Sequence, residues 1–87
     1  MSHLFVRHTV ENFDTWKSAY DEHGATRSSF GISDLALHRG ADNPNDVTMV
    51  FDLESLARGR EFVGSDDLKE AMMNAGVQGM PEIWFTD

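Results

Sequence analysis

The chain contains no cysteine, only two prolines, and few basic residues, 7 against 15 acidic ones. The absence of cysteine excludes disulfides, thiolate metal sites and cysteine nucleophiles. The formal net charge of −8 disfavours nucleic acids and anionic membranes as partners, since both attract basic surfaces. No apolar run approaches the roughly 18 residues of a membrane span, and no secretory signal is recognisable at the start. These absences predict a cytoplasmic protein without a membrane or nucleic-acid partner.

The 87 residues have the length and the 40% hydrophobic content of one folded domain, residues 1–87. Apolar side chains alternate over Leu4–Val10, as in a strand. One face of this strand holds Leu4, Val6, His8 and Val10, and the other holds Phe5, Arg7 and Thr9. Asn12 then caps a helix that is expected to end at Gly31. Its stripe, at steps of three and four, consists of Phe13, Trp16 and Tyr20, and it continues to His23 or Gly24 and then to Arg27.

Two further strands are separated by the turn-forming residues of Ala41–Asp46. The first is expected over Ile32–Gly40 and the second over Val47–Leu53. Strict alternation in the first strand places Leu35, Leu37 and Arg39 on one side, and Asp34, Ala36 and His38 on the other. The second strand has one wholly apolar face, and its other face still carries Val50, which fits a sheet that is covered on both sides.

The remaining third indicates helices and a last strand. A helix is expected over Ser55–Val63, ended by a glycine, and another over Ser65–Gly76, where serine or aspartate can form the cap. Val77–Pro81 is expected to be a connecting loop, and Glu82–Thr86 the final strand. The chain therefore has the order βαββαβ.

This order defines an α+β fold in which a four-stranded antiparallel sheet carries its helices on one face. The other face has no cover within the chain, and many of its residues are apolar, although the sequence leaves open which face His8 occupies. A second copy of the chain is the simplest cover for it. The sequence therefore predicts a homodimer.

Several segments resemble small dimeric α+β barrel proteins related to antibiotic-biosynthesis monooxygenase-like and polyketide cyclase-like domains. The resemblance begins with the run from His8 to Asp21, which contains Val10, Asn12, Phe13, Trp16, Lys17 and Tyr20. It continues with Arg27, Arg39, Asp42–Asn45, Leu68–Val77 and Pro81–Ile83, and so covers nearly the whole chain. The chain departs from the family pattern at Asn12, Leu53 and Met80. The family commonly has aspartate in place of Asn12, a tryptophan near the position of Leu53, and a second proline in place of Met80.

The resemblance implies a ferredoxin-like subunit that pairs sheet to sheet with its twin to form a dimeric α+β barrel. It also implies a pocket between the sheet and the helices. Family members with known activity act on hydrophobic, often aromatic or polyketide-like molecules, and several need no cofactor. Accordingly, no cofactor is expected here. Many other members have no established activity.

His8 is the strongest candidate for acid–base chemistry, because imidazole titrates near neutral pH. It shares a strand face with apolar residues, so burial should lower its pKa and favour the neutral ring. The alternative is a core histidine that is satisfied by a single acceptor. The sequence leaves both interpretations open.

Five more residues are candidate ligand contacts: Trp16, Tyr20, Arg27, Arg39 and Trp84. The two aromatic residues of the helical stripe are equally consistent with core positions. Arg27 would face a pocket mouth or simply cap a helix C-terminus. Arg39 has an alternative role in an ion pair with Asp52, Glu82 or a partner subunit. Trp84 would cover a flat ligand or seal the dimer.

Metal, nucleotide and serine-hydrolase sites have little support. His3 and His8 lie on opposite faces of one strand, and no carboxylate–histidine cluster is apparent. A haem ligand could be sought in His8, His23 or His38, but none has a distinguishing context. Neither a glycine-rich phosphate loop nor a G-x-S-x-G elbow is present.

Two hypotheses remain. In the first, the chain binds a small hydrophobic or aromatic molecule, with His8 as acid or base in proton abstraction or cofactor-free oxygenation and Arg27 or Tyr20 steadying an oxyanion. In the second, the same residues only hold together a non-catalytic dimeric module.

Overall fold

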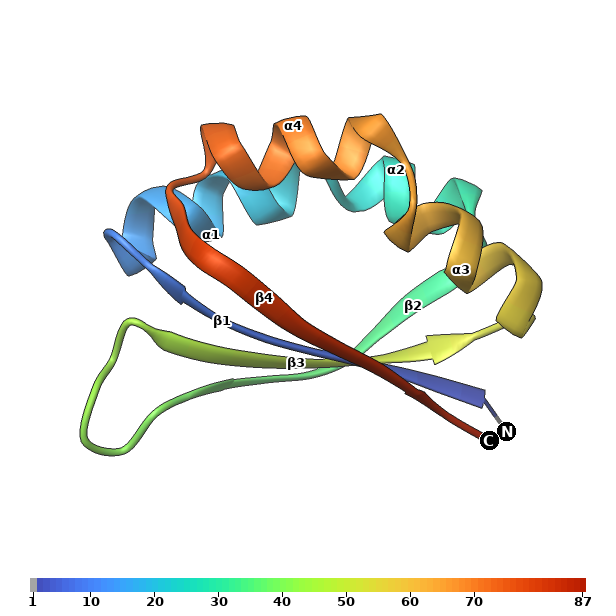
Figure 1. The fold of residues 1–87 in the computed structure, drawn as a ribbon, viewed down its shortest axis with the longest axis horizontal. Coiled ribbons are helices and arrows are strands. Elements are labelled where there is room, and N and C mark those ends of the chain that lie inside the picture. The colour runs from blue at the N-terminus through green and yellow to red at the C-terminus, as the bar shows by residue number, and fades with distance from the viewer. Residues whose placement is uncertain (1) are drawn as a thin grey trace.

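The structure is a computed structural model, and it describes residues 2–87. Its elements are β1 (Ser2–Val10), α1 (Phe13–Glu22), α2 (Gly24–Ser29), β2 (Ile32–Arg39), β3 (Asp46–Leu53), α3 (Leu56–Val63), α4 (Asp66–Asn74) and β4 (Val77–Thr86). The strands form one antiparallel sheet in the order β2-β3-β1-β4. All four helices lie on one face of this sheet (Figure 1), and Ser2 at the start of β1 bonds Asp87 near the end of β4. The predicted βαββαβ architecture is confirmed, with each helical region divided in two.

Side-chain caps explain where three of the helices begin. Asn12 Oδ1 accepts a hydrogen bond from the Thr15 backbone N–H at 3.0 Å, and α1 starts directly after Asn12, at Phe13. Ser55 Oγ caps α3 at 3.1 Å, and Ser65 Oγ caps α4 at 3.2 Å. Each bond satisfies an N–H group that has no partner within its own helix. These caps are the ones that the sequence predicts.

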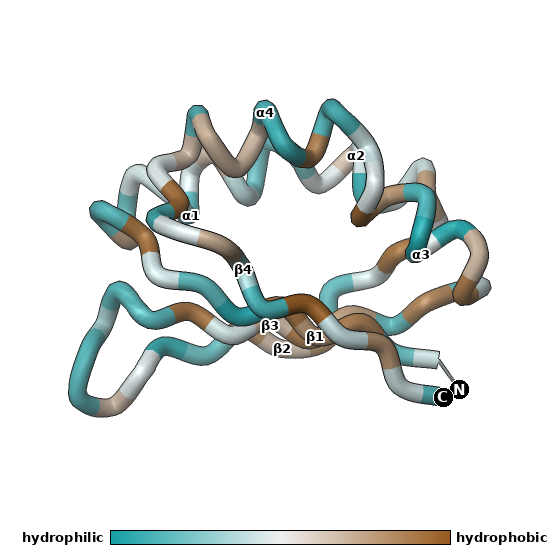
Figure 2. Tube along the Cα trace, viewed as in Figure 1, coloured by the Kyte–Doolittle hydropathy of each residue, from teal (hydrophilic) through white to brown (hydrophobic). Residues whose placement is uncertain are grey.

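The hydrophobic core lies between the sheet and the helices. Leu4, Val6, His8 and Val10 of β1 are buried, as the period-two pattern predicts. The matching face of β3 is buried as well, and Leu4, Val10 and Val47 are the largest side chains with almost no exposed surface. Figure 2 shows hydrophobic residues where the strands cross and mostly hydrophilic ones in the loop between β2 and β3. Within residues 2–87, no helix is both long and apolar enough to traverse a bilayer.

A bulge corrects the prediction for β2. The pairing with β3 shifts between Asp34 and Ala36, so Leu35 has no partner and is 55% exposed. One extra residue in a strand moves the side chains before it to the opposite face. Asp34 consequently lies on the helix side, with Leu37, rather than with Ala36 on the outer face. Strict alternation was wrong here because a bulge breaks it.

Two further boundaries differ from the predictions. The expected loop Val77–Pro81 is the first half of β4, where the pairing with β1 shifts between Arg7 and Thr9. Glycine and proline suggest a loop, but β4 is an edge strand, where proline is tolerated. The expected single helix ends at Glu22, and His23 separates it from α2.

The outer face of the sheet has an apolar centre and polar edges. Phe5 and Trp84 stack there with ring centroids 5.3 Å apart, and Trp84 is 42% exposed. Arg7 bonds Asp46 on the same face at 2.8 Å. No helix within residues 2–87 covers this side (Figure 1).

Candidate functional site

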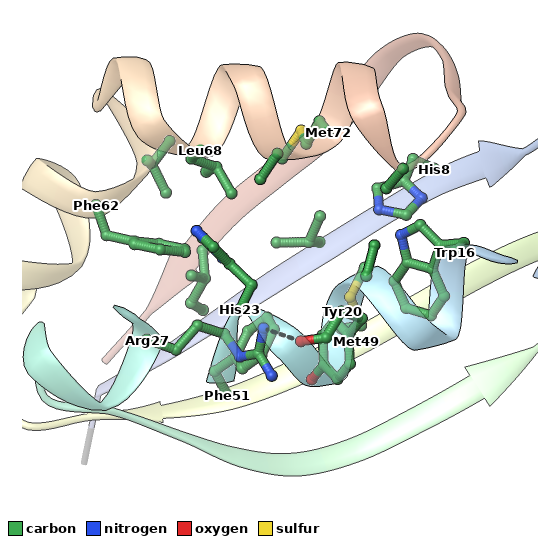
Figure 3. A pocket seen from close by; sticks show the side chains of 16 residues that line it. His8, Trp16, Tyr20, His23, Arg27, Met49, Phe51, Phe62, Leu68 and Met72 are labelled. Carbon is green, nitrogen blue, oxygen red and sulfur yellow. Dashed lines mark hydrogen bonds between the residues drawn. The ribbon is translucent and has the colours of Figure 1, made fainter. Parts of the chain in front are cut away.

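A cavity lies between the sheet and the helices, and Figure 3 shows its walls. The volume of the cavity, taken as the space that the centre of a water molecule can occupy, is about 60 Å³. This is enough for a few waters. Most of its lining is aliphatic or aromatic, with Met49 from β3, and Leu68 and Met72 from α4. The ionisable side chains in the lining are His8, Tyr20, His23 and Arg27. An apolar cavity with a few converging polar groups is the usual form of a small-molecule site.

One wall of the cavity is a row of stacked side chains. The His8 and Trp16 rings meet edge to face, with centroids 5.5 Å apart. Trp16 stacks on Tyr20 at 4.9 Å, and the Arg27 guanidinium lies 3.8 Å from the centre of the Tyr20 ring. This row passes over three strands, because Trp16 meets His8 of β1, Tyr20 packs on Phe51 of β3, and Arg27 bonds Asp34 of β2. The sequence-predicted residues His8, Trp16, Tyr20 and Arg27 are therefore brought together.

His8 stands at one end of this row and is only 6% exposed. Burial lowers the pKa of its imidazole. An interaction with its own backbone and the negative charge of Asp46 act in the opposite direction, but they offset this lowering only in part. Its Nδ1 atom is buried and has no hydrogen-bond partner within residues 2–87. In Figure 3 the nitrogen-bearing edge of the Trp16 indole faces the His8 ring. A neutral, buried imidazole with an unpaired nitrogen can accept a proton or a hydrogen bond from a molecule that reaches that nitrogen.

Arg27 and Tyr20 form a fixed unit at the other end of the row. Arg27 is 4% exposed, and its guanidinium donates to Asp34 at 3.1 and 3.4 Å and to the Tyr20 carbonyl at 2.8 Å. Burial, together with nearby Asp34, raises the pKa of the Tyr20 phenol well above its usual range and outweighs the opposing charge of Arg27. Tyr20 is therefore a neutral hydroxyl, and Arg27 already has a carboxylate partner.

Arg39 and Trp84 do not line this cavity. Arg39 donates to the Pro44 carbonyl at 2.9 Å and lies over the Phe13 ring at 3.8 Å. Within residues 2–87 it forms no ion pair with Asp52 or Glu82, and an ion pair with a partner subunit stays a prediction. Trp84 stacks on Phe5 on the outer face, so the sheet separates it from the cavity. Their candidate roles as ligand contacts in this cavity are not supported by their positions.

The structure adds a pair of residues that sequence reasoning missed. His23, between α1 and α2, lines the cavity, and its Nε2 lies 3.3 Å from Asp67 Oδ2 at the start of α4. The two residues are 44 positions apart, so no local motif could reveal the contact. The pair is one histidine beside one carboxylate, so it is not the metal-ligating cluster whose absence the sequence indicates. Within residues 2–87, no three potential metal-ligating side chains are grouped.

No protein-family model matches the chain, and no curated protein sequence matches it either. Several solved structures do match the chain. A candidate antibiotic biosynthesis monooxygenase from Bordetella bronchiseptica is 17% identical, with a TM-score of 0.79 over 99% of this chain and 94% of that one. Another from Caulobacter crescentus is 15% identical, with a TM-score of 0.75 over 99% and 87%. SnoaB, a cofactor-independent oxygenase from Streptomyces nogalater, is 13% identical, with a TM-score of 0.74 over 99% and 90%. The chain thus has the ferredoxin-like α+β fold of antibiotic biosynthesis monooxygenase-like proteins.

Proposed function

We propose that the protein binds a flat hydrophobic or aromatic molecule in the cavity and uses His8 as a base toward it. The buried Nδ1 of His8, which has no partner within residues 2–87, carries this proposal. The aromatic wall beside it supports a flat ligand, because Trp16 and Tyr20 would stack against ring systems. Arg27 would hold Tyr20 in place. The likeness in fold to a cofactor-independent oxygenase is consistent with this reading.

The chemistry that fits these residues is oxygenation of an activated ring carbon by dioxygen without a cofactor. His8 takes a proton from a CH₂ group between aromatic rings, and the carbanion passes one electron to dioxygen. Recombination forms a carbon–oxygen bond, and His8 returns its proton to the peroxide. Loss of water then breaks the O–O bond and leaves a ketone, so that R₂CH₂ and O₂ give R₂C=O and H₂O. The apolar surroundings would keep the imidazole neutral before each cycle.

Ligand entry requires the cavity to widen, since about 60 Å³ holds only a few waters. Met49 on β3 and Met72 on α4 line opposite sides of the cavity. Methionine has three rotatable bonds and adapts readily to new shapes. The volume therefore points to a cavity that opens around its ligand.

Binding can be tested with 2-naphthol as the probe, followed by quenching of tryptophan fluorescence. The wild-type protein is expected to show saturable quenching, and His8→Leu, which has no hydrogen-bonding side chain, to bind about fivefold more weakly, since one hydrogen bond contributes roughly 1 kcal/mol. Trp84→Phe removes the outer-face indole and should leave the quenching in place. If neither 2-naphthol nor 7-hydroxycoumarin saturates the wild-type signal, the proposal fails. The non-catalytic dimeric module would then be favoured.

We also propose that the protein forms a homodimer through the outer face of its sheet. The Phe5–Trp84 stack would form the centre of the interface, and the Arg7–Asp46 pair part of its polar rim. An apolar, aromatic centre within a polar rim is the usual composition of such interfaces. The helix-free face offers the room for a second sheet.

Sedimentation equilibrium tests the dimer. The wild-type chain is expected to sediment at twice the monomer mass at micromolar concentration. Trp84→Glu should weaken association at least tenfold, because it places a charge in the centre of the interface. Met73→Glu is the matched control: this methionine is 79% exposed on α4, on the other side of the sheet. A monomeric wild-type protein, or equal effects of the two substitutions, would contradict the proposal.

A further inference from the structure

The cavity holds two imidazoles in different electrostatic settings. His8 contacts Trp16, near the start of α1, whereas His23 follows the last residue of that helix. Two helical turns separate Trp16 from His23, or roughly 10 Å along the axis. In Figure 3 the His23 ring points toward Phe62 and Leu68, away from the His8 end. The two rings thus mark opposite ends of one apolar space.

Only His23 has a carboxylate within hydrogen-bonding distance. Its side chain is 16% exposed, and that of Asp67 is 63% exposed, so the carboxylate faces water while the ring faces the cavity. A carboxylate at Nε2 favours the tautomer with the proton on that nitrogen, which leaves the Nδ1 lone pair free. It also forms an ion pair with the ring once Nδ1 has taken a proton. His8 has no such partner within residues 2–87.

We infer that the His23–Asp67 pair binds a hydroxyl group of the aromatic ligand and takes its proton. The ligand O–H bond breaks, the proton moves to His23 Nδ1, and the ligand remains as a phenolate beside an imidazolium–carboxylate pair. The negative charge spreads through the ring system toward the His8 end, which favours electron transfer to dioxygen. The inference rests on the proposed function, because it assigns a second role within the same cavity. It names the ligand class as fused-ring aromatics with a hydroxyl group at one end.

The ionisation of a bound probe tests this inference separately from binding. 7-Hydroxycoumarin is a flat phenol whose phenolate has its own absorption band, so its apparent pKa can be read in the presence of saturating protein. Wild-type protein is expected to lower that apparent pKa, and Asp67→Asn and His23→Gln to raise it again by about one pH unit. Loss of a negative charge alone would act in the opposite direction, because it would favour the phenolate. The sign of the shift therefore distinguishes the pair from a general electrostatic effect.

Matched controls are available in the same chain. Asp66→Asn removes the same charge from the same turn of α4, and His38→Gln removes an exposed imidazole from β2. Both are expected to leave the apparent pKa of the probe as in wild type. If the probe quenches tryptophan fluorescence but its pKa is equal in wild type, Asp67→Asn and His23→Gln, this inference is overturned and the binding proposal stands. Failure of wild type to bind either phenol would overturn both.

Discussion

Replacing Trp16 with alanine is expected to lower the free energy of unfolding by about 3–5 kcal/mol, the usual range for truncating a buried aromatic side chain. Trp16 is 3% exposed and lies against His8, Phe13 and Tyr20. A small domain is stable by only about 5–15 kcal/mol in total. Urea unfolding followed by circular dichroism should therefore show a large fall in the midpoint, or no folded baseline at all.

The second tryptophan provides the control for this experiment. Trp84 is 42% exposed and contacts Phe5 on the outer face of the sheet. At protein concentrations where the chain is monomeric, Trp84→Ala should lower the free energy of unfolding by well under half as much as Trp16→Ala does. Trp16→Phe retains a ring and should recover much of the loss. Equal losses for the two alanine variants would show that Trp16 is not the core residue described here.

The sequence predicted those features that depend on neighbours along the chain. Alternation in β1 grouped His8 with Leu4, Val6 and Val10, although it left open which sheet face they occupy, and the spacing of Trp16 and Tyr20 placed them on one helical stripe. The caps Asn12 and Ser55 act within three residues. Period and capping are local properties, so they could be read without knowing how the elements pack.

Features that depend on packing could not be read in this way. The bulge that turns Asp34 toward Arg27 arises from the pairing of β2 with β3. The contact of His23 with Asp67 requires the junction of α1 and α2 to meet the first turn of α4, which no local pattern specifies. Trp84 alternates with buried neighbours, and only the pairing of β4 with β1 decides which set faces outward. Tertiary pairing, rather than residue type, determined each of these outcomes.

Replacing His8 with glutamine is expected to reduce cofactor-free oxygen uptake by about 100- to 10,000-fold, the usual contribution of a general base. An oxygen electrode with 1,8-dihydroxyanthrone as the probe measures this, because its CH₂ group lies between two rings. Glutamine keeps a hydrogen-bonding side chain but cannot hold the proton. His38→Gln, at an exposed site on β2, is the matched control and should keep the wild-type rate. Equal rates for wild type and His8→Gln would remove His8 from the chemistry.

The pH profile of the same reaction follows from the burial of His8. A base must be neutral, and burial lowers the pKa of His8 below its usual 6.5. Wild-type uptake should therefore persist as the pH falls through 6.5 and decline only below it.

The free energy of unfolding should also fall as the pH falls below 6.5. The unfolded chain takes up the proton of His8 more readily than the folded chain does, so the folded state loses at most about 1.4 kcal/mol of stability per pH unit. Asp46, whose pKa is lowered by its hydrogen bond to Arg7, titrates below this window. His8→Gln should flatten the stability profile there, and an unchanged slope would show that the folded and unfolded chains protonate His8 at the same pH.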